Sequence, residues 1–226
     1  MLVSHGRKLV FVHIQKTGGD TVSRLMRESI PDIFCFKAKH EFAVKAAAEL
    51  DRWNEYFKFA FVRNPWDRLV SWYSMIRDAE TIRWHQILTD QRRRSHFRQT
   101  RENKLWRYVL DNSSTFEEFI INCTDEVEVD EGVYYSFAHN QLDYIADSNN
   151  DLLVDFIGRF ESFGSDLYKV YDRLGLELGS IPHENRSVRG HYSTFYTPET
   201  ETIVRKRFER DIEYFGYEFE NVGNSA

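Results

Sequence analysis

A lysine and a threonine stand directly before a pair of glycines in the stretch HIQKTGGDT, residues 13–21. An apolar, β-branched run at residues 9–14 precedes the glycines, and apolar residues at helical spacing follow them, so we expect a strand, a turn and a helix. Such a turn points backbone N–H groups and the positive end of a helix at one spot. The segment therefore predicts a phosphate or sulfate cradle formed by Lys16, Thr17, Gly18 and Gly19. An ordinary tight turn with an exposed lysine is the alternative.

The order of residues in this cradle differs from that of a Walker A loop. A Walker A loop places its Lys-Ser/Thr pair after the last glycine, at the start of the helix. Here Lys16 and Thr17 come before Gly18 and Gly19. The order favours a related cradle that serves a different nucleotide.

A second strand end carries an arginine. Residues 56–62 (YFKFAFV) are rich in aromatic and β-branched residues and predict a strand that ends at Arg63. Asn64 and Pro65 then suit the N-cap and first position of a helix, and Ser71 lies farther along it. The guanidinium of Arg63 offers a planar fork for phosphate; pairing with a carboxylate within the fold is its alternative role.

A histidine lies at another junction between a strand and a helix. We expect a short strand near residues 33–36 and a helix from Glu41, with His40 directly before the helix. Ligands of open α/β sheets bind at the carboxyl ends of the strands, and a histidine there can act as a general base. By position alone, a surface or capping histidine is the more common case.

The two segments HIQKTGGDT and FAFVRNPWDRLVSWY resemble the nucleotide-binding signatures of sulfotransferases that use 3′-phosphoadenosine 5′-phosphosulfate (PAPS), and most closely those of the bacterial and carbohydrate-type branch. Three later stretches, at residues 157–161, 182–187 and 211–219, also resemble this family. The resemblance implies an α/β, P-loop-like three-layer fold with a central, mostly parallel sheet flanked by helices. It also implies one sulfotransferase domain over residues 1–226.

The resemblance assigns roles to particular residues. The 5′-phosphosulfate would be held by Lys16, Thr17, Gly18, Gly19 and Thr21. The 3′-phosphate would be held by Arg63 and Ser71, with Arg189 from a late segment as a further contact. Lys16 and His40 would be catalytic, His40 as the base that takes a proton from the acceptor. The product would be 3′,5′-adenosine bisphosphate, and no metal is expected.

One residue departs from the family pattern. Relatives usually carry a hydroxyl residue directly after the double glycine, whereas this chain has Asp20. A carboxylate close to a phosphosulfate would repel it unless it turned away. We expect Asp20 to cap the helix or to steer the Lys16 ammonium, and not to bind the nucleotide.

Composition limits the possible partners. The net charge of −6 argues against general nucleic-acid binding, and no apolar run reaches the length of a membrane span. The two cysteines fit a reducing compartment, so we expect a soluble, cytoplasmic protein without stable membrane insertion. A basic segment at residues 91–107 is either a solvated helix or loop or a wall for an anionic acceptor. The acceptor, a small molecule or a glycan, and the oligomeric state stay open.

Three functions are compatible with these patterns. The first is a PAPS-dependent sulfotransferase that acts on a hydroxyl or amine, possibly of a carbohydrate, by in-line transfer. The second is a P-loop-like kinase that uses ATP, which the residue order around Gly18 and Gly19 disfavours. The third is a noncatalytic nucleotide-binding module. We favour the first.

Overall fold

The computed structural model describes residues 1–82, 88–130, 133–135, 137, 139–181 and 190–220. The chain forms two compact units. Unit 1 comprises Met1–Asn64 and Asn140–Arg186, and unit 2 comprises Pro65–His139 and Ser187–Ala226.

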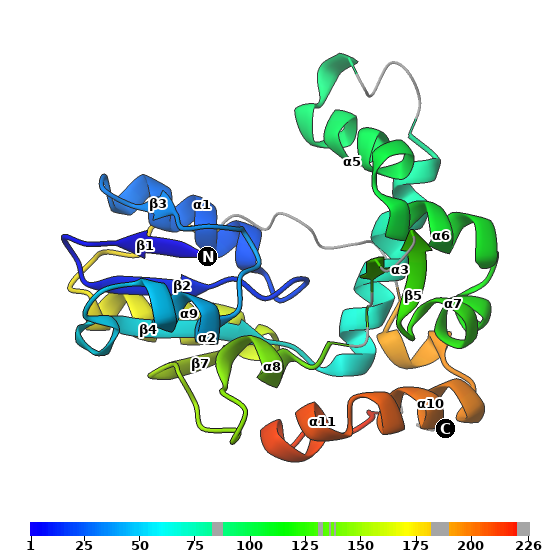
Figure 1. Cartoon of the computed structure of the whole chain (residues 1–226). Helices are drawn as coiled ribbons and strands as arrows, with labels where there is room; N and C mark the ends of the chain where they lie inside the picture. Colours follow the sequence, from blue (N-terminus) through cyan, green and yellow to red (C-terminus); the bar gives the residue numbers. More distant parts are fainter. Residues whose placement is uncertain (83–87, 131–132, 136, 138, 182–189, 221–226) are drawn as a thin grey trace. The chain divides into compact units, whose positions relative to one another are not determined.

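Unit 1 is built on a five-stranded sheet with the order β3-β1-β2-β4-β7 (Figure 1). The strands are β1 (Leu2–Ser4), β2 (Leu9–Val12), β3 (Phe34–Cys35), β4 (Phe57–Val62) and β7 (Phe156–Arg159). Strand β4 pairs in parallel with β2 and β7, whereas β1 is antiparallel to both β2 and β3. Four of the five strands therefore run in one direction, which confirms the mostly parallel sheet.

Helices cover this sheet because its strands are apolar on both faces. They are α1 (Gly19–Ser29), α2 (Ala43–Glu49), α8 (Gln141–Ile145) and α9 (Phe163–Arg173), with short 3₁₀ turns at η1 (Trp53–Glu55) and η2 (Phe160–Ser162). Phe11 and Phe59 pack with Met26 of α1 and Tyr171 of α9 in one buried core. Helix α2 lies on the opposite side of the sheet from α9 (Figure 1). The helix–sheet–helix arrangement confirms the expected α/β, P-loop-like fold class.

Unit 2 is mainly helical. Its elements are α3 (Pro65–Glu80), α5 (Gln91–Glu102), α6 (Lys104–Asn112), α7 (Phe116–Cys123), α10 (Pro198–Arg207), α11 (Glu209–Phe215), η3 (Tyr192–Phe195) and a hairpin of β5 (Val127–Asp130) and β6 (Val133–Tyr135). Aromatic rings form much of its interior, where Phe116 contacts Tyr73, Phe119 and Tyr196. No helix in the described part of the chain is long and apolar enough to cross a membrane.

Local sequence features account for several of these elements. The acidic run before the hairpin alternates valine and acid, which is typical of a strand, and it forms β5. Helix α8 begins after Asn140, whose capping box with Asp143 starts a helix there. Helices α10 and α11 meet at Phe208. The sequence analysis did not predict strand β1.

Candidate active site

The loop between β2 and α1 contains two residues in the left-handed region. Lys16 has φ 67° and Gly18 has φ 84°. For a lysine this conformation costs on the order of 1–3 kcal/mol, and such residues cluster at functional sites. Successive N–H groups in a turn of this kind form a concave anion site. A loop with this backbone conformation can form such a site.

Both glycines are required by close neighbours. A Cβ on Gly18 would lie 2.7 Å from the ring of Phe163, and a Cβ on Gly19 would overlap the ring of His13. A side chain at either position would force the loop away from the sheet. The double glycine thus allows α1 to begin directly against β2 and α9.

The first turn of α1 has open backbone donors. The carbonyl of Gly18 accepts from the amides of Thr21 and Val22, at 3.1 and 3.3 Å. No side chain caps the helix, and the first N–H groups of an α-helix have no partner within the helix itself. The hydroxyl of Thr17 donates to the carbonyl of Ile14, at 2.9 Å. An anion at this loop would therefore meet backbone N–H groups, because the Thr17 hydroxyl already donates to Ile14.

Arg63 reaches this loop from the neighbouring strand. Strands β2 and β4 are parallel partners, so their carboxyl ends meet at one edge. Nη1 of Arg63 donates to the carbonyl of Lys16, at 3.1 Å, and its guanidinium lies 3.9 Å from the ring centroid of Phe160. Gln141 holds the backbone of Arg63 by two hydrogen bonds of 2.8 Å. The structure thus brings together the two strand ends that the sequence analysis selected.

His40 is held in a defined tautomer. Its Nδ1 lies 2.9 Å from the carbonyl oxygen of His13. A carbonyl can only accept, so Nδ1 carries the proton and Nε2 of the neutral ring has a free lone pair. Burial lowers the pKa of His40 to about 4, although the hydrogen bond to His13 opposes the shift. His40 is therefore neutral at pH 7 and able to accept a proton at Nε2.

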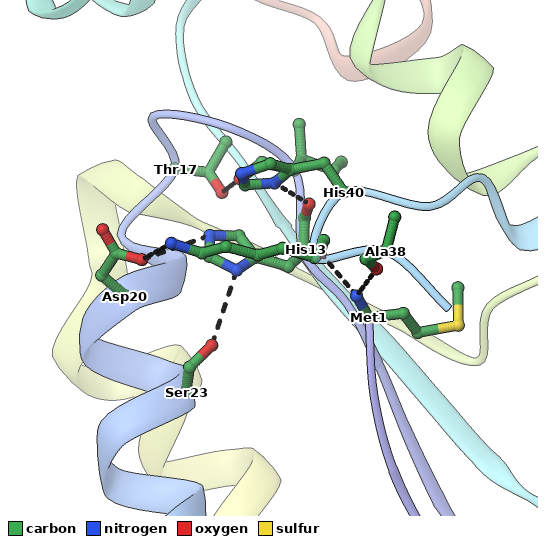
Figure 2. Close-up of polar contacts among 9 residues, drawn as sticks. Met1, His13, Thr17, Asp20, Ser23, Ala38 and His40 are labelled. Atoms are coloured by element: carbon green, nitrogen blue, oxygen red, sulfur yellow. Dashed lines mark hydrogen bonds and ion pairs between the residues drawn. The ribbon is translucent and has the colours of Figure 1, made fainter. Parts of the chain in front are cut away.

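His13 links the cradle to this histidine, as Figure 2 shows. His13 is 3% exposed as a residue, and its ring stands edge-on to the ring of His40, with 4.6 Å between centroids. Ser23 Oγ lies 3.5 Å from Nδ1 of His13, and Asp20 lies 3.9 Å from Nε2. Burial and the neighbouring His40 both hold the pKa of His13 below its usual range. Sequence reasoning missed this role, although His13 is the single polar residue in the apolar run at residues 9–14.

Asp20 turns toward the segment that carries His40. A carboxylate oxygen of Asp20 lies 2.6 Å from Nζ of Lys39. Partial desolvation by neighbouring atoms would raise the pKa of Asp20, but the hydrogen bond and charge of Lys39 outweigh it and keep that pKa low. Asp20 does not cap α1, and it forms no described ion pair with Lys16. Its partner is instead Lys39, which the sequence analysis did not propose.

The remaining expected ligands are placed as follows. Thr21 is buried in the first turn of α1. Ser71 is half-buried in α3, within unit 2. Arg189 lies outside the described residues.

A protein-family model described as "Sulfotransferase family" matches residues 1–218, a span that includes the loop, Arg63 and His40. A search of curated proteins finds no match.

Proposed function

The chain belongs to the sulfotransferase family, and on this premise we propose that it transfers a sulfuryl group from PAPS to a hydroxyl or amine acceptor, possibly a carbohydrate. We further propose that residues 1–226 work as one sulfotransferase domain. The observation that carries the proposal is the contact between Arg63 and the Lys16 carbonyl. It places a guanidinium and a set of open amides at one edge of the sheet, as a ligand with two separate anionic groups requires.

The residues of the loop fit the 5′ end of such a donor. PAPS supplies a sulfuryl group joined to a phosphate that leaves as an anion. The Lys16 ammonium and the amides at Gly18 and Gly19 would stabilise the charge that grows on this leaving phosphate. Thr17 and Thr21 would contribute to the same subsite, Thr17 through its backbone because its hydroxyl is bonded to Ile14.

The 3′-phosphate would be held by Arg63, whose guanidinium is oriented by Phe160 and Lys16. Ser71 and Arg189 are proposed as further ligands of this phosphate. ATP has no 3′-phosphate, so a site built around Arg63 would bind the bisphosphate more tightly than ATP.

His40 would act as the general base. Its free Nε2 can take the proton that the acceptor loses as it attacks, and a positioned base of this kind contributes about 100- to 10,000-fold in rate. His13 would hold the ring through its carbonyl. Lys16 and His40 are thus the proposed catalytic residues.

A thermal-shift comparison tests the donor. We expect 3′,5′-adenosine bisphosphate to stabilise the protein, by about 2.7 kcal/mol at 100 times its dissociation constant, and Mg-ATP to stabilise it much less. Arg63→Gln should remove this preference. Stronger stabilisation by Mg-ATP would favour a kinase. Binding of the bisphosphate without sulfate transfer to any of a panel of hydroxyl and amine acceptors would favour a noncatalytic module.

A further inference from the structure

Helix α8 contacts both strand ends of the candidate site through two side chains, Gln141 and Tyr144. These residues are three positions apart in the helix, so they are neighbours on one of its faces. Both are buried, Gln141 completely and Tyr144 with 3% of its surface exposed. Neither has a role in donor binding or in the transfer step as proposed above.

Gln141 fixes the backbone of Arg63 on both sides. Its Oε1 accepts from the amide of Arg63, and its Nε2 donates to the carbonyl of the same residue, both at 2.8 Å. Strand β4 ends at Val62, so Gln141 takes the place of a strand partner for the first residue beyond the strand. Fixing both backbone groups of a residue also fixes the direction in which its side chain leaves the chain. Gln141 therefore determines where the guanidinium of Arg63 can reach.

Tyr144 connects α8 to the other two segments of the site. Its hydroxyl donates to Oε1 of Gln15, at 2.9 Å, and Gln15 directly precedes Lys16. Its ring is stacked on the ring of Phe42, with 4.5 Å between centroids and 4° between planes. Phe42 lies two residues after His40. One side chain thus contacts both the loop and the segment of the candidate base.

The helix that carries these side chains is itself held at both ends. At its start, the side chain of Asp143 accepts from the amide of Asn140, at 3.0 Å. At its end, the carbonyl of Ile145 accepts from the amide of Leu153, at 2.8 Å. Leu153 lies in the segment that leads into β7, a parallel partner of β4. Helix α8 is therefore fixed to the sheet whose strand ends it contacts.

We propose that α8 is the positioning element of the site. Gln141 directs the guanidinium of Arg63, and Tyr144 holds the loop against the segment of His40. Both residues act through others and do not contact the donor themselves. The inference rests on the proposed function, because the 3′-phosphate assigned to Arg63 and the 5′ group assigned to the loop are those of PAPS.

Two nucleotides separate the two positioning roles. 3′,5′-Adenosine bisphosphate carries both phosphates, whereas adenosine 5′-monophosphate lacks the 3′-phosphate, and calorimetry gives the dissociation constant of each. We expect Gln141→Met to lower the preference for the bisphosphate about tenfold, as weakening a hydrogen bond to a charged group does, and to leave binding of the monophosphate unchanged. Tyr144→Phe keeps the ring on Phe42 but loses the bond to Gln15. It should weaken both nucleotides equally, about fivefold, and keep the preference.

Two control variants lose comparable contacts elsewhere in unit 1. Asp155 accepts from a backbone amide near the start of β4, at 2.7 Å, much as Gln141 does beyond the end of that strand. Tyr171 is a second buried tyrosine, and its hydroxyl shares a hydrogen bond of 3.2 Å with Ser29. Asp155→Ala and Tyr171→Phe should leave both dissociation constants unchanged. A loss of preference in Asp155→Ala equal to that in Gln141→Met would overturn the specific role of Gln141.

Amide hydrogen exchange tests the role of Gln141 without any nucleotide. In Gln141→Met the amide of Arg63 should exchange at least tenfold faster than in the wild type, relative to the amide of Phe59 at the centre of β4. If Gln141→Met does not fold, Gln141→Asn replaces it, since its side chain is one methylene too short to reach both backbone groups of Arg63.

The outcomes separate this inference from the donor assignment. An unchanged preference in the Gln141 variant, or unchanged affinities in Tyr144→Phe, overturns the positioning roles. If the wild type does not prefer the bisphosphate to the monophosphate, the donor assignment fails, and exchange at Arg63 alone then decides whether Gln141 holds that residue. Exchange at Arg63 that does not respond to the loss of Gln141 overturns the inference in either case.

Discussion

The ammonium nitrogen of Lys39 lies 2.6 Å from a carboxylate oxygen of Asp20, and this ion pair joins the first turn of α1 to the residue directly before His40. Both side chains are more than half exposed, at 56% and 65%, so the pair adds little to stability, about 1 kcal/mol or less. Its effect should instead be on the placement of the His40 segment relative to the cradle.

We therefore expect Asp20→Asn to change unfolding by less than about 1 kcal/mol but to lower kcat by up to about 100-fold, the cost of misplacing a reacting group by about 1 Å. Steady-state kinetics with PAPS, alongside urea unfolding, measures both quantities. Glu102→Gln, which breaks the exposed pair with Arg98, is the matched control and should leave kcat unchanged. A double-mutant cycle with Lys39→Met gives the coupling between the two residues, and a coupling near zero in kcat would rule out the positioning role.

The free Nε2 of His40 leads to a second prediction. His40→Gln should reduce transfer by about 100- to 10,000-fold and leave binding of 3′,5′-adenosine bisphosphate intact. Because the pKa of His40 lies at about 4, kcat/KM should stay level as the pH falls from 7 to 5 and drop only near pH 4. His5→Gln, at an exposed histidine of unit 1, should keep full activity. A drop centred near pH 6.5 would contradict the assignment.

His13, which is buried, and His40, which is half-buried, also predict how stability depends on pH. The pKa values of His13 and His40 are both lowered in the folded protein, whereas in the unfolded chain they lie near 6.5. Below pH 6.5 the unfolded chain binds protons that the folded protein does not. Stability is therefore complete above pH 6.5 and lost as the pH falls through the window from about 6.5 to 4, with a slope of up to about 1.4 kcal/mol per pH unit for each histidine.

Urea unfolding of the wild type and His40→Gln at several pH values between 4.5 and 7.5 measures this slope. In His40→Gln the slope of stability with pH should be smaller by the contribution of one histidine. An identical slope in the two proteins would show that His40 is not buried in its neutral form.

The strand ends of the site could be predicted from the sequence because each is marked locally. The glycines between β2 and α1, and Asn64-Pro65 after Arg63, specify turns and helix starts by their own backbone preferences. The contact between Arg63 and Lys16 then follows from two parallel strands being neighbours. The roles that the family resemblance gave to these residues remain proposals.

The parts that were missed depend on contacts between distant segments. The pairing of β1 with β2 and β3, the bond from His40 to His13 and the ion pair of Asp20 with Lys39 all join residues whose proximity only the folded sheet determines. Strand β1 is only three residues long and gives no period to detect. His13 looked like an interruption in an apolar strand, although its ring packs between the cradle and the candidate base.

The overlap between Gly19 and His13 gives the last prediction. A Cβ at residue 19 would occupy the space of the His13 ring, and that ring cannot move freely because it is buried against His40 and α1. We expect Gly19→Ala to destabilise the protein by about 1–3 kcal/mol, as overpacking does, and to weaken binding of 3′,5′-adenosine bisphosphate, because the amides of the cradle shift with the loop.

Gly179→Ala is the control: no atom lies within 4 Å of its Cβ position, so the stability of this variant should differ from that of the wild type by no more than about 0.5 kcal/mol. The double variant His13→Ala/Gly19→Ala makes room for the methyl group and should recover part of the lost binding. If Gly19→Ala alone binds the bisphosphate as tightly as the wild type, the cradle does not depend on the packing of His13 against the loop.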